Sequence, residues 1–144
     1  MRWGHRIRLL FVADIIPLEL RRIVEFLNDQ MGTRDIIFGT GKENGSVYPG
    51  FKPGGVSINP VYLSSDGKFW VQFGSLENKP VFGPIEARRE LMQRFNAIDN
   101  VNFTDADLTK YPSIPLTTIA HDPHGLNKML TALTWMEQQI EQTT

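Results

Sequence analysis

Apolar and polar positions at the start of the chain predict a strand followed by a helix. Residues 7–13 are apolar except for Arg8, as is typical of a short and largely buried strand. Asp14 can cap the helix that follows, and Pro17 lies near its start, where the missing N–H costs least. From Leu20 to Met31, apolar residues recur at spacings of three and four, which places them on one face of a helix.

The middle of the chain is rich in glycine and proline, which predicts short strands joined by turns. Short strands are expected at 36–38 and at 56–63, with a break or bulge at Pro60. Residues 65–67 have the sequence Ser-Asp-Gly, which is typical of a tight turn. We therefore predict a hairpin between 56–63 and a second strand at 68–76. Along this second strand, two sets of residues alternate: Phe69, Val71 and Phe73 against Trp70, Gln72 and Gly74.

Two further helices are predicted in the second half of the chain. The first begins near residues 82–84, and its apolar positions recur at helical spacing: Ala87, Leu91, Phe95 and Ile98. Three arginines fall on or near its opposite face: Arg88, Arg89 and Arg94. A brief strand is expected at 100–103, and 112–116 is extended because each proline restricts the residue before it. Asp122 and Pro123 cap the last helix, whose apolar stripe comprises Leu126, Met129, Leu130, Leu133, Met136 and Ile140, with Trp135 beside it.

These elements predict an α+β fold, in which a small antiparallel or mixed β-sheet carries about three helices. The 144 residues fit a single domain, with a strand–helix unit at 1–31 and a glycine-rich sheet with two helices at 35–144. The sequence contains no cysteine, which excludes a disulfide framework, a thiolate zinc site, an iron–sulfur cluster and a cysteine nucleophile.

The charges are nearly balanced, since 15 basic and 16 acidic side chains give a formal net charge of −1. Such a chain has no overall excess of positive charge to attract nucleic acid. The basic start of the chain is followed by an apolar run that is too short for a secretory signal, and no segment is long enough to span a membrane. We expect a cytoplasmic protein without a membrane partner.

Residues 39–46 superficially resemble a phosphate-binding loop. In such a loop, a lysine and a hydroxyl residue directly follow the last glycine, whereas Lys42 precedes Gly45 here. A dinucleotide-binding loop would lead into a helix, which Val47–Gly50 cannot begin. A hairpin turn or loop is therefore favoured, and a genuine anion nest that includes Lys42 and Ser46 is the alternative.

Two pairs of side chains are candidates for contact with a partner. Trp70 and Gln72 lie opposite the buried positions of their strand. Trp70 therefore either stacks on a base or anchors a partner, or it is covered by a helix and belongs to the core. Arg88 and Arg89 either contact phosphate or form a solvated helix face.

Candidate metal ligands are few. His121 and His124 are three residues apart across an Asp-Pro sequence, a spacing that suits helix capping better than metal binding. Asp105 and Asp107 could share a metal on an extended chain, but a turn or helix start is favoured. No nucleophile motif accompanies them, and we expect no cofactor.

Several short motifs occur in a fixed order along the chain: Gly41–Ser46, Val71–Phe73, Pro80–Phe82, Arg89–Leu91, Arg94–Asn96, Pro112–Leu116 and Trp135. In this order they resemble the small α/β C-terminal domain of a bacterial family whose N-terminal part is a PD-(D/E)xK endonuclease-like domain. Residues 6–28 resemble the last strand and helix of that nuclease-like part. The resemblance covers most of the chain and implies the fold of the C-terminal domain, for which no activity is assigned.

The resemblance does not carry catalytic residues into this chain. In the family, the Asp and the Glu-x-Lys that hold the metal lie before the strand and helix, so we expect this chain to begin after them. Phosphodiester cleavage of that kind needs acidic ligands on adjacent strands to hold the ion and activate water. The resemblance therefore implies a nuclease-associated domain without the nuclease activity, and whether the chain is an enzyme of another kind stays open.

The favoured hypothesis is a non-catalytic binding domain linked to nucleic-acid metabolism or phage–host defence. Its partner would be nucleic acid or a nuclease-type protein, and its binding residues would be Lys42, Ser46, Trp70, Gln72, Arg88 and Arg89. One alternative is a protein-binding inhibitor or accessory subunit, a decoy derived from a defence nuclease. The other is a metal-dependent hydrolase that uses Asp105 and Asp107. The sequence leaves the oligomeric state open.

Overall fold

The computed structural model describes residue 22 and residues 35–39, 46–64 and 67–143. The strand expected at 7–13, most of the helix expected at 20–31 and Lys42 lie outside these residues. Arg22, which falls within that expected helix, is helical and exposed.

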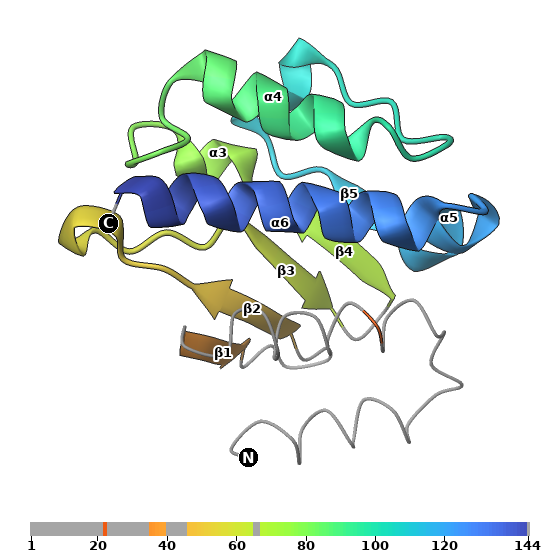
Figure 1. The fold of residues 1–144 in the computed structure, drawn as a ribbon, viewed down its shortest axis with the longest axis horizontal. Coiled ribbons are helices and arrows are strands. Elements are labelled where there is room, and N and C mark those ends of the chain that lie inside the picture. The colour runs from red at the N-terminus through yellow and green to blue at the C-terminus, as the bar shows by residue number, and fades with distance from the viewer. Residues whose placement is uncertain (1–21, 23–34, 40–45, 65–66, 144) are drawn as a thin grey trace.

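Within the described residues, five strands form one antiparallel sheet, whose strand order follows the sequence (Figure 1). They are β1 (Asp35–Gly39), β2 (Ser46–Gly50), β3 (Val61–Ser64), β4 (Lys68–Val71) and β5 (Ser113–Pro115). The chain between β4 and β5 forms helical segments before β5 returns to pair with β4. This sheet and its helices confirm the expected α+β fold.

The central hairpin is shorter than the sequence predicts. Its strands span 61–64 and 68–71 rather than 56–63 and 68–76. Before β3, the chain forms the 3-10 helix η1 (Pro53–Gly55) and an isolated bridge between Phe51 and Ile58. After β4, residues 73–76 form the short helix α3 (Phe73–Leu76) instead of continuing the strand. Both end residues of α3 are buried, so the apolar side chains that suggested a strand still enter the core.

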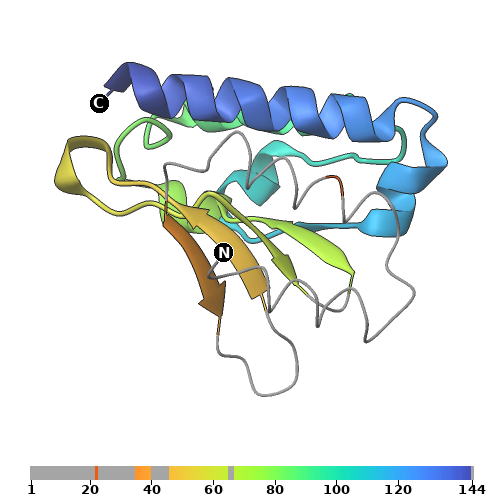
Figure 2. The same ribbon diagram turned by 60° about the horizontal axis from the view of Figure 1, so that its bottom comes forward.

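Four helical segments follow: α4 (Ile85–Phe95), the 3-10 helix η2 (Asp105–Thr109), α5 (Leu116–His121) and α6 (Gly125–Thr143). Helices α4 and α6 lie side by side on one face of the sheet (Figures 1 and 2). Helix α5 was not predicted, because Pro115 suggested only extended chain. Proline nevertheless suits the start of a helix, where Pro115 lies. Within the described ranges, none of the helices combines the length and apolar character needed to cross a membrane.

The prediction of a brief strand at 100–103 is wrong, because these residues form a turn and irregular chain. Asn100 adopts a φ of 68°, in the left-handed region that asparagine tolerates better than most residues. The side chain of Asn96 then takes the place of a partner strand. Its Nδ2 donates to the carbonyl oxygen of Phe103 and its Oδ1 accepts from the N–H of Phe103, both at 2.9 Å. One side chain therefore satisfies the backbone groups of Phe103.

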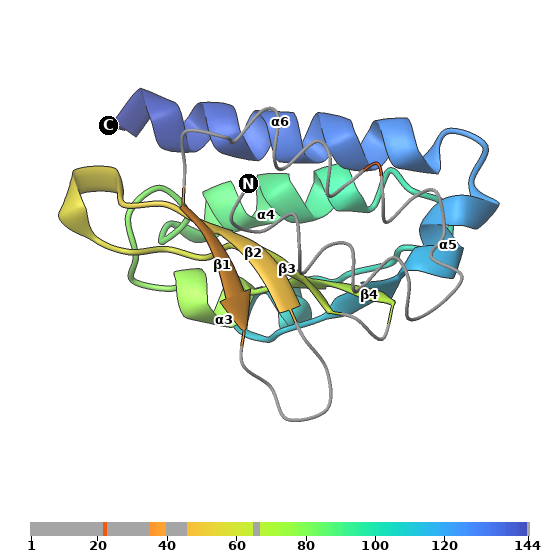
Figure 3. The same cartoon turned by 90° about the horizontal axis from the view of Figure 1, so that it is seen from below.

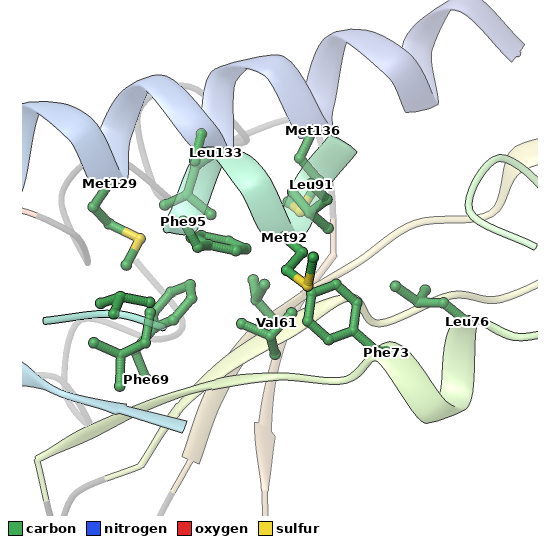
Figure 4. Packing of buried hydrophobic residues seen from close by; sticks show 14 of the residues in the cluster. Val61, Phe69, Phe73, Leu76, Leu91, Met92, Phe95, Met129, Leu133 and Met136 are labelled. Carbon is green, nitrogen blue, oxygen red and sulfur yellow. The ribbon is translucent and has the colours of Figure 1, made fainter. Parts of the chain in front are cut away.

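The core lies between the sheet and the two long helices (Figure 4). Phe69 of β4 packs against Phe95 of α4, with ring centroids 5.7 Å apart. Helix α6 contributes Met129, Leu133 and Met136, all fully buried. The apolar stripes predicted for these two helices therefore do face the core.

The start of α6 is held by the buried carboxylate of Asp122. Its Oδ1 accepts from the N–H of His124 at 2.8 Å, and its Oδ2 accepts from the N–H of Asp99 at 2.9 Å. Lys128 Nζ also donates to Oδ2, at 2.7 Å. This hydrogen bond from Lys128, helped by the two backbone N–H groups, lowers the pKa of Asp122 from 3.8 to about 2. Asp122 thus organises the entry to the last helix, as predicted.

Candidate functional site

The face of the sheet opposite α4 and α6 carries two aromatic rings and a lysine. Trp70 on β4 pairs with Tyr62 on β3, and their rings stack with centroids 5.7 Å apart and planes 7° apart. Lys68 Nζ lies 5.7 Å from the centroid of the Trp70 ring, within the range of a cation–π interaction. Trp70 Nε1–H donates to Ser64 Oγ at 3.0 Å. We call Tyr62, Lys68 and Trp70 the aromatic cluster.

Trp70 is half-buried, between the two alternatives that the sequence left open. Its neighbours on β4, Phe69 and Val71, are fully buried on the core side. The alternation predicted for this strand is therefore confirmed. Helices α4 and α6 lie on the other side of the sheet, so neither covers Trp70 (Figure 3).

Strand register places position 46 near the aromatic cluster. Ser46 at the start of β2 pairs with Ser64 at the end of β3, and Ser64 pairs with Lys68. Because directly paired positions share a face of the sheet, Ser64 and Lys68 both lie on the face of Trp70. The connection that contains Lys42 lies outside the described residues. It joins β1 to β2 at this same end of the sheet.

Gln72 does not join the aromatic cluster. Its Nε2 donates to the carbonyl oxygen of Asn59 at 3.0 Å, and its backbone N–H donates to the carbonyl oxygen of Pro60 at 2.8 Å. Both bonds tie the chain before β3 to the chain after β4. Gln72 therefore holds together the end of the hairpin that lies away from the turn.

Arg88 was expected on or near the exposed face of α4, and that placement is wrong. Its residue exposure is only 4%. Nη1 donates to the carbonyl oxygen of Leu108 at 2.5 Å, and Nη2 donates to that of Gly83 at 3.2 Å. Arg88 precedes Leu91 and Phe95 by three and seven residues, so it shares their buried helix face. It fastens α4 to η2 instead of offering its charge to a partner.

Arg89 lies at the surface and is already paired. Its Nε and Nη2 each donate to one carboxylate oxygen of Asp105, both at 3.2 Å. The hydrogen bond and the charge of Asp105 raise the pKa of Arg89 above its ordinary value. The guanidinium that was a candidate for contact with phosphate therefore binds a carboxylate of its own chain.

The two aspartates considered as metal ligands belong to the start of η2. Asp105 holds Arg89, and Asp107 Oδ2 accepts from the N–H of Thr104 at 2.8 Å in a capping box. This is the helix-start role that the sequence favoured. Among the residues that the structure describes, no group of three or more histidines and acids could hold a metal ion.

A Glu-x-Lys tripeptide does occur in the sequence, at Glu77–Lys79. It lies in the exposed turn after α3, where Asn78 has a φ of 65°. A nuclease metal site would need such a tripeptide on a strand beside further acidic ligands. The position of Glu77–Lys79 therefore lends no support to the hydrolase alternative.

A groove between α4 and α6, which we call the α4–α6 groove, was not predicted from the sequence. It consists of two adjoining hollows of about 380 and 250 Å³ that share Arg94, Asn127 and Thr131. The larger hollow is also lined by Leu130, Thr134, Trp135 and Gln138, and the smaller by Ala97, Lys128 and Ala132. The guanidinium carbon of Arg94 lies 4.5 Å from the ring centroid of Trp135.

One sequence signal could have revealed this groove. Four uncharged polar residues recur at spacings of four, three and four along α6 and are all exposed: Asn127, Thr131, Thr134 and Gln138. The exposed face of a surface helix normally carries charged residues. These four side chains are polar but uncharged, and the two threonines are short, so a hollow remains between α6 and α4. An uncharged polar stripe on an exposed helix face could therefore have indicated a binding groove.

Two candidate surfaces therefore emerge from the described residues, the aromatic cluster and the α4–α6 groove. The function of each has to be argued from its own chemistry. Comparison of the chain with models of protein families, with curated proteins and with solved structures gives no match.

Proposed function

We propose that this protein is a non-catalytic, cytoplasmic binding domain linked to nucleic-acid metabolism or phage–host defence, and that its partner is single-stranded nucleic acid. The observation that carries the proposal is the aromatic cluster. Proteins that bind single strands combine cations for the phosphates with aromatic rings on which bases stack. Lys68, Trp70 and Tyr62 supply both on one face of the sheet.

The geometry of the cluster suits stacking. The rings of Tyr62 and Trp70 are nearly parallel, so together they form an aromatic surface on this face of the sheet against which a base can pack. The hydrogen bond from Trp70 Nε1 to Ser64 fixes the ring before any ligand arrives, which lowers the entropy cost of binding. Lys68, held near the Trp70 ring, is within reach of the phosphate beside a stacked base.

The distribution of charge makes the aromatic cluster a better candidate for binding nucleic acid than Arg88 or Arg89 of α4. The net charge of −1 offers no general attraction for a polyanion, so binding must rely on a local site. Arg88 is buried and Arg89 is paired with Asp105. Position 46 belongs to the end of the sheet where Lys68 lies. The resemblance to a nuclease-associated domain agrees with such a role.

The test is a titration of a fluorescent oligothymidylate with the protein, followed by anisotropy at several salt concentrations. Trp70→Leu should weaken binding about tenfold or more, because stacking on an aromatic ring is worth about 1–3 kcal/mol per base. Lys68→Gln should lower the slope of log K against log salt by about 0.7, the share of one phosphate contact on a single strand. Lys110→Gln, an exposed lysine at the end of η2, is the matched control and should bind like the parent protein.

Circular dichroism of each variant shows whether the fold is retained. Absence of binding by the parent protein would contradict the proposal. Equal binding by Trp70→Leu and Lys68→Gln in folded form would contradict it as well. A duplex of the same length that competes as well as the single strand would show that stacking is not used.

A further inference from the structure

The α4–α6 groove is separate from the aromatic cluster, which lies on the other face of the sheet. Among the described residues that line the groove, the charged ones are Arg94 and Lys128, and no carboxylate is present. Its other polar lining residues are uncharged: Asn127, Thr131, Thr134 and Gln138. The groove therefore complements an anionic ligand that also forms hydrogen bonds and apolar contacts.

The two cations of the groove differ in availability. Lys128 Nζ lies 2.7 Å from Asp122 Oδ2 and 3.9 Å from Asp99 Oδ1, so its charge is already balanced. Arg94 Nε lies 3.7 Å from Glu90 Oε2, which is too long for a hydrogen bond. Arg94 Nε is buried and, within the described part of the chain, has no hydrogen-bond partner. The Arg94 side chain as a whole is 34% exposed and, unlike Lys128, is held to its carboxylate only at ion-pair distance, so Arg94 is the cation that an incoming anion would meet.

Stacking on Trp135 prepares Arg94 for this role. The guanidinium carbon lies 4.5 Å from the centroid of the Trp135 ring, which limits the orientations of the guanidinium. The N–H groups at its edge are suited to two parallel hydrogen bonds with one carboxylate. The Trp135 ring also packs against Phe82, with centroids 6.2 Å apart. With Arg94 over the ring and Phe82 beside it, Trp135 holds the guanidinium in place at the edge of the groove.

We propose that the α4–α6 groove binds a short acidic segment of a partner protein. One carboxylate of the segment binds the guanidinium of Arg94, and flanking apolar side chains contact Trp135 and Leu130. Tryptophan and arginine are the residues that most often dominate the energy of a protein interface. The side-chain amides of Asn127 and Gln138 form hydrogen bonds with backbone groups of the segment.

A protein segment fits this groove better than nucleic acid does. A polyanion gains its affinity from several free cations, whereas Lys128 is hydrogen-bonded to Asp122 and only Arg94, which meets Glu90 at ion-pair distance, is left to bind an anion. One guanidinium matches one carboxylate. This site goes beyond the proposed binding of nucleic acid, and either site can fail without the other.

The experiment selects peptides for the intact protein from a displayed library of random short sequences. The enriched peptides should share an acidic residue. One of them is synthesised and titrated into ¹⁵N-labelled protein, where the side-chain signals of Arg94 Nε–H and Trp135 Nε1–H should shift and saturate. Changing the acidic residue of the peptide to its amide should weaken binding about tenfold, since a hydrogen-bonded charge pair is lost.

Three variants locate the contact. Arg94→Met should weaken the peptide about tenfold, and Arg94→Lys should weaken it less because it keeps the charge but not the planar fork. Arg89→Met changes the same residue type on the same helix outside the groove and should bind like the parent protein. If Arg94→Met does not fold, Arg94→Lys and the amide form of the peptide still decide the outcome.

Several results would overturn the proposal. The library can yield no binder, or only binders without an acidic residue. The shifts can fall on the aromatic cluster instead of the groove, or folded Arg94→Met can bind as tightly as the parent protein. If inorganic phosphate displaces the peptide at low concentration, the groove holds small anions and not a protein segment.

Discussion

Replacing Arg88 with methionine should destabilise the fold, although the sequence places this arginine among solvated charges. Methionine keeps the unbranched apolar stem and removes the guanidinium. The two hydrogen bonds lost run to the carbonyl oxygens of Leu108 and Gly83. Hydrogen bonds of charged groups are worth about 1.5–3 kcal/mol each, and removal of a buried charge returns part of its desolvation cost. We expect a net loss of about 3 kcal/mol, or roughly 10 °C in Tm for a chain of this size.

The assay is urea unfolding at neutral pH, followed by circular dichroism, for the parent protein and for two neighbouring variants. Arg88→Met should lower the urea midpoint without changing the slope of the transition. Arg89→Met serves as the matched control, because Arg89 lies one position along the same helix and its pair with Asp105 is exposed. Exposed ion pairs contribute little to stability and are screened by salt, so this variant should stay close to the parent protein.

Equal losses in the two variants would refute this reasoning, because they would show that burial does not distinguish the two arginines. An unchanged midpoint for Arg88→Met would show that its guanidinium does not fasten α4 to η2. A folded Arg88→Met that loses affinity for the oligonucleotide would restore Arg88 as a binding residue.

Two further predictions concern the entry to α6. The pKa of Asp122 lies below its unfolded value, so the stability that its carboxylate contributes is complete above about pH 3.8 and is lost as the pH falls through about 2. The difference in urea midpoint between the parent protein and Asp122→Asn should therefore shrink over this range, and a constant difference would contradict it. Gly125→Ala should lower the Tm by several degrees, because its Cβ would collide with the carbonyl oxygen of Ile119, whereas Gln142→Ala at an exposed position should leave the Tm unchanged.

The spacing of apolar residues correctly predicted those elements in which every residue of the apolar stripe is turned toward the core. The stripes of α4 and α6, the turn ending at Gly67 and the alternation along β4 all follow from apolar positions and turn residues. The predictions of a strand at 100–103 and of a longer strand at 68–76 failed, because at both places a side chain makes the hydrogen bonds that a neighbouring strand would otherwise make. Asn96 binds the backbone of Phe103, and Gln72 ends the hairpin, and neither contact is visible from sequence spacing.

The candidate site was harder to predict, because charge alone does not reveal burial. Arg88 lies at helical spacing from Leu91 and Phe95, and a charged residue at such a position is ordinarily assigned to the surface. Trp70 was correctly placed on the strand face opposite Phe69 and Val71, although the sequence left open whether a helix covers it, and its stack with Tyr62 depends on strand register. Val81, with a φ of 74°, adopts a backbone conformation that β-branched residues rarely take, and no pattern points to it.

Among the described strands, β5 lies at one edge of the sheet and limits how this protein can associate with others. Leu116 N–H donates to the carbonyl oxygen of Gly67 on the β4 side, so the backbone of Pro115, one residue earlier, is directed to the outer edge. Pro115 has no N–H, so a foreign strand laid along this edge would meet a gap in its hydrogen-bond ladder. Lateral growth of the sheet and capture of an extended peptide by strand addition are thereby discouraged at β5. A partner that binds at this edge would therefore be selected through side-chain contacts more than through backbone pairing.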